Sequence, residues 1–316
     1  MEGAGPLEVT FYGVRGSTPC ACDANAGIGG NTACVVVTGD GFAPFTFDLG
    51  TGLRFWADAM GSSAVAEPFI ATALVSHLHW DHVQGLPFFF PLHEFGASLH
   101  IVGPHQDDGR SLRESFDSFM TPPYFPVGLD QLAADFTFQE VTDDLLHFGT
   151  ATVRAMPIPH VGATVGYRVE HDGRSVVYVS DHQQPGCGAT DVAAAVLDLC
   201  RDADLLIHDA QYTEEEFAKR YTWGHCTPAY AVEVAVQSGA KRLALFHHDP
   251  AHDDEQVLRL ADEAAKLVAG RGDVEVFAAR GPHRLSGLRP PNPGDAPTGS
   301  VGTRDNVGTR GGSAGK

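Results

Sequence analysis

The sequence feature that most constrains this chain is the run SHLHWDH at residues 76–82, which carries three histidines and one aspartate. It follows ATALV at 71–75, a short apolar segment typical of a buried strand. A loop at a strand end can direct several side chains at one point. Imidazole and carboxylate groups bind zinc, and manganese or iron accepts them too. The run predicts a metal site. His77 and His79 lie before a bend and Asp81 and His82 lie after it, so the two pairs predict two adjacent metals.

Other polar residues lie where predicted strands at 45–48, 152–157, 175–179 and 243–246 end: Asp48, His160, Asp181 and His247. A histidine after a proline-stiffened strand end is well placed to be a third ligand of the first metal, which points to His160. His248 is the alternative to His247, because a shift of one residue would exchange the two sides of the chain. His182 follows Asp181 and has no assigned role.

The spacing His-x-His-x-Asp-His, followed by Gly85-Leu86-Pro87, resembles the signature of the metallo-β-lactamase superfamily, and most of all its ribonuclease Z and cyclic phosphodiesterase branch. The resemblance implies an α/β fold, a four-layer αβ/βα sandwich with the metals at the sheet edges. It implies a metal ligand set of His77, His79 and His160 for the first metal, and Asp81, His82 and His247 for the second, with Asp181 shared. It also implies that Asp48 braces the loop at 76–82, which we call the metal loop, by hydrogen bonds without touching a metal.

A second stretch strengthens this resemblance. Gly224-His225-Cys226-Thr227 opens a predicted helix that runs to Ser238 and leads into Gly239-Ala240-Lys241-Arg242-Leu243, as in ribonuclease Z-like phosphodiesterases, although Cys226 replaces the usual serine. The resemblance implies that His225, paired with an acid at Asp209 in place of the commoner glutamate, protonates the leaving group. The expected catalytic residues are therefore Asp81, His225 and Asp209.

Size and composition favour one domain followed by a tail. The chain has 316 residues and 43% hydrophobic content, so we expect a domain at 1–286 and a disordered Pro, Gly and Ser-rich tail at 287–316. Within the domain, 87–146 is rich in aromatic residues and proline, and TPPYFP at 121–126 cannot form regular structure. We interpret 87–146 as an insertion that is a lid, a contact between two copies in a homodimer, or a segment packed on its own domain.

Charge and targeting signals limit the partners. A net charge of -19, from 40 acidic and 21 basic residues, argues against long nucleic acid, because nucleic-acid binding depends on Lys and Arg. A small anionic substrate remains compatible with this net negative charge. The start MEGAGPLEVT is unlike a secretory signal, and no apolar run is long enough for a membrane span, so we expect a soluble cytoplasmic protein with no membrane partner. The six cysteines are interpreted as free thiols, with a metal site at Cys20 and Cys22 as the alternative.

The predicted function is a dinuclear metal-dependent phosphodiesterase that uses two Zn²⁺, or Mn²⁺ or Fe²⁺, and a hydroxide shared by the metals. The interval between His160 and Asp181 has no room for the long arm with which ribonuclease Z holds tRNA. The substrate is therefore predicted to be a small phosphodiester, such as a cyclic nucleotide or a cyclic ribose phosphate. Arg15 and the turn at 29–32 contact its phosphate or form an ordinary hairpin. The alternatives are a metal-dependent hydrolase of a lactone or thioester and a non-enzymatic metal-dependent sensor.

Overall fold

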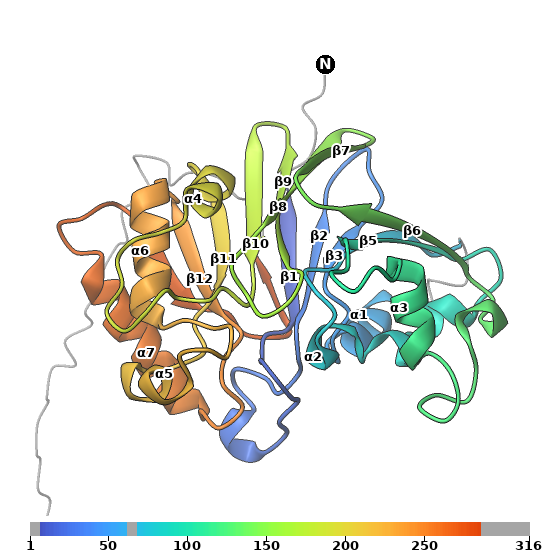
Figure 1. Ribbon diagram of the computed structural model, residues 1–316, viewed down its shortest axis with the longest axis horizontal. Coiled ribbons are helices and arrows are strands. Elements are labelled where there is room, and N and C mark those ends of the chain that lie inside the picture. The colour runs from blue at the N-terminus through green and yellow to red at the C-terminus, as the bar shows by residue number, and fades with distance from the viewer. Residues whose placement is uncertain (1–6, 62–67, 286–316) are drawn as a thin grey trace, which may run out of the picture.

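A computed structural model describes residues 7–61 and 68–285, which form two seven-stranded sheets with helices on their outer faces (Figure 1). The first sheet contains, in spatial order, β14 (His283–Leu285), β1 (Glu8–Gly13), β2 (Cys34–Thr38), β3 (Phe45–Phe47), β4 (Ile70–Leu74), β5 (Ser98–Pro104) and β6 (Asp135–Val141). The second contains β13 (Glu275–Ala278), β12 (Arg242–Phe246), β11 (Leu205–Asp209), β10 (Arg174–Val179), β9 (Val165–His171), β8 (Ala151–Pro157) and β7 (Asp144–Phe148). The helices are α1 (Leu53–Met60), α2 (Trp80–Val83), α3 (Leu112–Phe119), α4 (Ala194–Cys200), α5 (Glu214–Arg220), α6 (Pro228–Ser238) and α7 (Asp254–Leu267).

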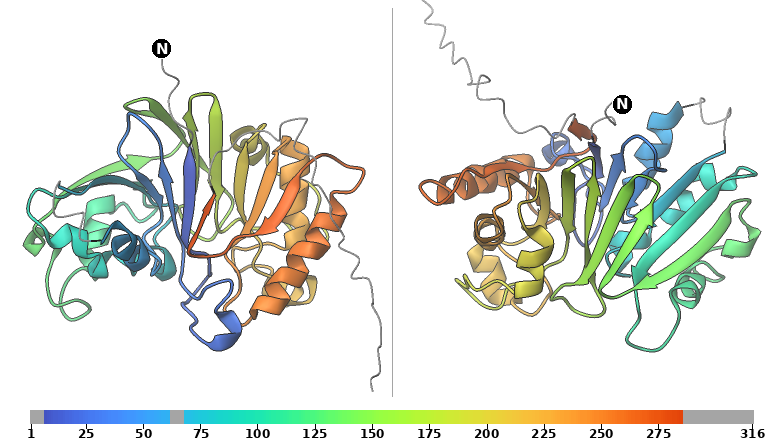
Figure 2. Two further views of the ribbon diagram at one scale, coloured as in Figure 1. Left: turned by 180° about the vertical axis from the view of Figure 1, so that it is seen from behind. Right: turned by 90° about the horizontal axis from the view of Figure 1, so that it is seen from above.

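Three apolar clusters hold the layers together. The central cluster lies between the two sheets, where the rings of Phe47 and Tyr178 stack with centroids 4.7 Å apart. A second cluster packs α4, α6 and α7 on the outside of the second sheet, and a third packs α1 and α3 on the outside of the first. Figure 2 shows the two sheets side by side with helices on either flank. The predicted four-layer αβ/βα sandwich is confirmed.

Strand direction brings the predicted polar residues to one edge. β3 and β4 run parallel in the first sheet, and β10, β11 and β12 run parallel in the second. The carboxyl ends of these parallel strands lie at one edge of each sheet. The loops that follow the strands therefore meet at that edge. The short helix α2, which begins inside the metal loop, lies at this edge between the two halves (Figure 1).

The segment 87–146 is more regular than its composition suggests. It supplies β5, α3 and β6, and β5 and β6 extend the first sheet by parallel pairing. Ser111 caps α3 in a capping box with Glu114, which explains why a helix begins here despite the nearby aromatic residues.

The part near 121–126 lacks helix and strand, as predicted. There the ring of Phe125 packs edge-on against Phe88, with centroids 6.0 Å apart. Phe119, just before it, packs against Trp80 of the metal loop at 5.7 Å. The segment thus lies beside the metal loop, and its role as a lid or a dimer contact stays a prediction. The predicted tail at 287–316 lies outside the described residues.

We predict that Phe47→Ala destabilises the fold by about 3–5 kcal/mol, because it leaves a cavity between the two sheets. Urea unfolding followed by circular dichroism measures this change in the free energy of unfolding. Phe95→Ala is the matched control, since Phe95 is 91% exposed, and it should change stability by less than about 0.5 kcal/mol. Equal losses in the two variants would contradict this account of the core.

Candidate metal centre

Four ligand atoms from three loops form a compact group that we call the second cluster: Asp81, His82, His247 and one oxygen of Asp181. His247 Nε2 lies 3.1 Å from Asp81 Oδ2, 3.1 Å from Asp181 Oδ1 and 3.2 Å from His82 Nε2. His82 Nε2 lies 3.2 Å from Asp81 Oδ2 and 3.3 Å from Asp181 Oδ1. Ligands of a tetrahedral ion with bonds of about 2.0 Å are separated by about 3.3 Å. The spacing therefore fits one tetrahedral metal ion.

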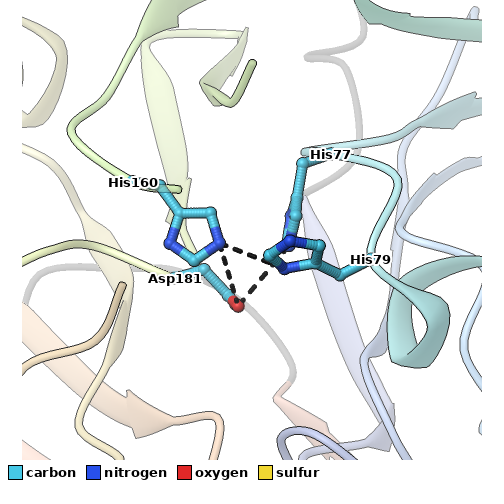
Figure 3. A group of neighbouring side chains, drawn as sticks. All are labelled: His77, His79, His160 and Asp181. Carbon is cyan, nitrogen blue, oxygen red and sulfur yellow. Dashed lines mark hydrogen bonds and ion pairs between the residues drawn. The ribbon is translucent and has the colours of Figure 1, made fainter. Parts of the chain in front are cut away.

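The first cluster consists of His77, His79, His160 and the other oxygen of Asp181, and its side chains point toward one another in Figure 3. His79 Nδ1 and His160 Nε2 are 3.2 Å apart. Asp181 Oδ2 lies 3.6 Å from His77 Nε2 and 3.9 Å from His160 Nε2. Asp181 thus directs Oδ1 at one cluster and Oδ2 at the other, which is the arrangement of a carboxylate shared by two metals.

The histidine tautomers show that a cation fits these clusters. His82 Nδ1 donates to Asp48 and His247 Nδ1 donates to the side-chain oxygen of Gln211, at 2.7 and 2.8 Å. In the neutral tautomers their Nε2 atoms therefore carry lone pairs, which face each other and two carboxylates. His160 Nδ1 donates to Gly224 O at 2.7 Å, so the Nε2 of its neutral ring is likewise free to donate a lone pair to a metal. A metal ion would satisfy all of these acceptors at once, whereas without one the neighbouring carboxylates raise the pKa of His82 and favour a proton there.

Burial keeps the histidines of the first cluster neutral, which metal binding requires. Burial, together with neighbouring His82, holds the pKa of His77 well below its ordinary value. Burial also lowers the pKa of His160 to about 4. His77 Nε2 is buried and has no hydrogen-bond partner in the described part of the chain. A neutral imidazole with an unsatisfied buried nitrogen is a suitable metal ligand.

Asp48 is the main organiser of the metal loop. Its buried carboxylate accepts hydrogen bonds from Ser76 N at 2.7 Å, Ser76 Oγ at 2.9 Å and Tyr178 OH at 2.7 Å, in addition to His82. Ser76 Oγ in turn accepts from His77 Nδ1 at 3.0 Å. One carboxylate therefore orients a histidine in each cluster, and no interaction places it in a cluster itself.

The backbone is strained where it presents the site. Asp48, Asp181 and His247 each have φ near the left-handed region, at 57°, 57° and 58°. Such conformations cost about 1–3 kcal/mol for residues with a side chain, and they cluster at functional sites. Gly224 also has positive φ, and a Cβ there would lie 2.2 Å from the His160 ring. Close packing around the ligands thus requires both the strained residues and this glycine.

His225 and Asp209 form a buried pair beside the clusters. Asp209 Oδ2 lies 2.8 Å from His225 Nδ1, so the shorter acid reaches the histidine, and Oδ1 accepts from Gln211 N at 2.9 Å. Burial alone would lower the pKa of His225, but the Asp209 carboxylate outweighs it and the pKa is raised. The distance from His225 Nδ1 to Asp181 Oδ2 is 3.8 Å. Because Nδ1 already donates to Asp209, the pair is satisfied without a metal, unlike the two clusters.

Several open assignments are settled by position. His247 joins the second cluster, whereas His248 Nε2 faces away and donates to Ala279 O at 2.9 Å. His182 lies outside the clusters and pairs through Nδ1 with His208 Nε2 at 2.9 Å. Cys20 and Cys22 join no group of metal-ligating side chains within the described ranges.

Of the two interpretations of Arg15, the structure contradicts contact with a substrate phosphate. Its side chain is fully buried and donates to the backbone oxygens of Gly29, Asp249 and His252. These bonds fasten the loop after β1 to the loop after β12. Arg15 is therefore a structural residue, because no part of its guanidinium is left to meet a ligand from solvent.

Two residues at the site were not anticipated from the sequence. Gln211 orients His247, and its Nε2 donates to Ser17 Oγ at 3.1 Å. Ser17 N donates to Asp81 Oδ2 at 2.7 Å. The position of Gln211, two residues after Asp209 at a strand end, was the one available signal, whereas Ser17 approaches only through the fold.

Comparison with known proteins agrees with this geometry. The family model described as "Beta-lactamase superfamily domain" matches residues 52–248, which is more than half of the chain. Ribonuclease Z of Haloarcula marismortui is 26% identical over 76% of this chain and 86% of its own. Ribonuclease Z of Halobacterium salinarum is 29% identical over 86% of this chain and 95% of its own. The chain belongs to the beta-lactamase superfamily.

Solved structures support the same fold. The metallo-beta-lactamase fold protein YhfI from Bacillus subtilis has a TM-score of 0.64 and 19% identity over 90% of this chain and 100% of its own. Human tRNase Z, short form, has a TM-score of 0.61 and 22% identity over 88% and 98%. A diphosphatase from the PhnP family has a TM-score of 0.59 and 18% identity over 89% and 97%.

Family and site together define a metal-dependent hydrolase that is a distant relative of ribonuclease Z. The buried His and Asp clusters indicate a dinuclear metal site. No helix in the described part of the chain is long and apolar enough to cross a membrane.

We predict that Asp181→Ala reduces metal binding at both clusters, whereas His79→Ala reduces it only at the first. Mass spectrometry of the metal content should give about two ions per wild-type chain, about one for His79→Ala and fewer for Asp181→Ala. His105→Ala is the control, because His105 is exposed and pairs with Glu140 away from the clusters. Wild-type metal content in Asp181→Ala would show that this carboxylate is not shared.

Proposed function

We propose that this hydrolase cleaves small phosphodiesters with two Zn²⁺ ions, with Mn²⁺ or Fe²⁺ as the alternatives. The observation that carries the proposal is the His225–Asp209 pair beside the clusters, which is suited to delivering a proton. His77, His79 and His160 would hold one ion, Asp81, His82 and His247 the other, and Asp181 both. When bound, such a pair of ions lowers the pKa of a shared water toward about 7 and neutralises charge on phosphoryl oxygens.

The residues of the chain have distinct roles in this proposal. Asp209 fixes His225 through Nδ1, which leaves Nε2 without a hydrogen-bond partner among the described residues and able to carry the proton. The Asp209 carboxylate raises the pKa of His225, which favours the protonated ring that a donor to the leaving oxygen needs. Asp81 is both ligand and structural anchor, since Ser17 N donates to it.

Relatives and charge support the choice of substrate class. The relatives from Haloarcula marismortui and Halobacterium salinarum are named ribonuclease Z, so phosphodiester chemistry is the nearest precedent. A net charge of -19 disfavours long nucleic acid and favours a small diester, such as a cyclic nucleotide or cyclic ribose phosphate. The protein is proposed to act in the cytoplasm without a membrane or nucleic-acid partner.

The function is tested by comparing bis(p-nitrophenyl) phosphate with a panel of lactones and thioesters on the metal-loaded protein. We expect turnover of the phosphodiester and little of the acyl substrates, because relatives named ribonuclease Z set the precedent for phosphodiester chemistry and paired ions neutralise charge on phosphoryl oxygens. Hydrolysis of lactones or thioesters without phosphodiesterase turnover would overturn the proposal. Turnover of neither, with full metal content, would favour a sensor.

We predict that the effect of His225→Ala depends on the leaving group. A diester with an alkyl leaving group, which needs a proton, should lose about 10²–10⁴ in rate, whereas one that releases 4-nitrophenol should lose much less. Asp209→Asn should reproduce this pattern in weaker form, because it loosens His225 without removing it. Metal content is measured in parallel and should not change. Equal losses for both leaving groups would contradict proton donation by His225.

A further inference from the structure

A cavity of about 460 Å³ opens beside the metal loop. It is lined by the loop after β1, by α1 and by the residues that follow α2, among them Asn31, Arg54, Phe55, Gln84 and Phe88. Its volume is in the range of about 300–1,000 Å³ that small-molecule sites occupy. None of the residues that line it belongs to the metal clusters or to the His225–Asp209 pair.

Two walls of the cavity are tied directly to the second cluster. Gln84 follows His82 by two residues, and His82 O accepts from Leu49 N at 2.7 Å, while Leu49 O accepts from Gly85 N at 2.8 Å. The loop after β1, which supplies Pro19, donates Ser17 N to Asp81. The cavity and the second cluster are therefore built on the same two loops.

The cavity offers hydrogen-bond donors to an anion. Arg54 is exposed and has no hydrogen-bond or ion-pair partner in the described part of the chain. An unpaired arginine is notable in a chain with 40 acidic and 21 basic residues. Gln84 Nε2 is buried without a hydrogen-bond partner. Guanidinium groups bind phosphate and carboxylate through paired N–H groups, and the amide adds a third donor.

The same cavity offers aromatic surface. Phe55 is 38% exposed and Phe88 is 59% exposed, and both line it. Phe125 packs edge-on against Phe88 at 87°, which fixes the orientation of that ring. Exposed rings that are held in place stack well on planar groups such as nucleobases. The cavity thus combines surface for a planar ring with donors for a negative charge.

We propose that this cavity binds a nucleoside monophosphate unit, whose base contacts Phe55 and Phe88 and whose phosphate meets Arg54 and Gln84. The inference rests on the proposed function, because it makes this unit one arm of the diester that the metal clusters hold. It replaces the cyclic examples given above with a diester whose nucleotide arm carries a phosphate of its own, because the single phosphate of a cyclic nucleotide would be held by the metal clusters.

Isothermal titration of the metal-loaded protein tests the inference with three probes. Adenosine 5′-monophosphate has both ring and phosphate, ribose 5-phosphate lacks the base, and adenosine lacks the phosphate. We expect the nucleotide to bind about tenfold more tightly than either fragment. Equal affinity for the nucleotide and ribose 5-phosphate would overturn the inference, because the metals alone would then account for binding.

Two variants locate the binding to the cavity. Phe88→Ala should reduce nucleotide affinity about tenfold toward that of ribose 5-phosphate, and Arg54→Gln about tenfold toward that of adenosine. Both side chains are exposed, so the variants should fold. The matched controls are Phe95→Ala and Arg110→Gln, which lie outside the lining residues and should leave affinity unchanged. Unchanged affinity in both cavity variants would refute the site.

The outcomes separate this inference from the proposed function. Hydrolysis of bis(p-nitrophenyl) phosphate without selective nucleotide binding would leave the function standing and sink the cavity assignment. Nucleotide binding that both cavity variants weaken, without hydrolysis of any phosphodiester, would support the cavity as a nucleotide site and refute the proposed reaction.

Discussion

The structure depends on one electrostatic constraint, which is that two buried carboxylates and two imidazole nitrogens converge on one point. In the second cluster each imidazole Nε2 lies within 3.3 Å of the other imidazole and of both carboxylates. Without a cation this arrangement would be strongly unfavourable, because buried charges require partners. Metal binding and the correct folding of this edge are therefore coupled.

The surrounding fold holds these atoms in place against that repulsion. Asp48 collects donors from the metal loop and from Tyr178 in the opposite sheet, so it ties the two sheets together at the site. The stacking of Phe47 on Tyr178 places that hydroxyl beside Asp48. The same residues thus contribute to core packing and to ligand orientation. A substitution that disturbs the packing should therefore also disturb the orientation of the ligands.

The proposed chemistry follows from the position of Asp181 between the two clusters. Its two oxygens face the two clusters, and His225 lies beside Oδ2 with its own acid behind it. In the proposed reaction, the proton donor and the metal centre would lie within one small volume, as hydrolysis of a poor leaving group requires. The cavity on the same loops would hold the part of the substrate that does not react.

The sequence by itself determined the ligand types and much of the fold. The histidine spacing at 77–82 and the polar residues after apolar strands carried the family resemblance that implied the sandwich, in which the strand ends share an edge. The resemblance already favoured His247 over His248, and the tertiary structure places His247 in the second cluster; only the tertiary structure showed that Arg15 is buried. It also revealed Gln211 and Ser17 as supports and made β5 and β6 part of the first sheet. These features depend on contacts between residues far apart in the chain, which local patterns do not encode.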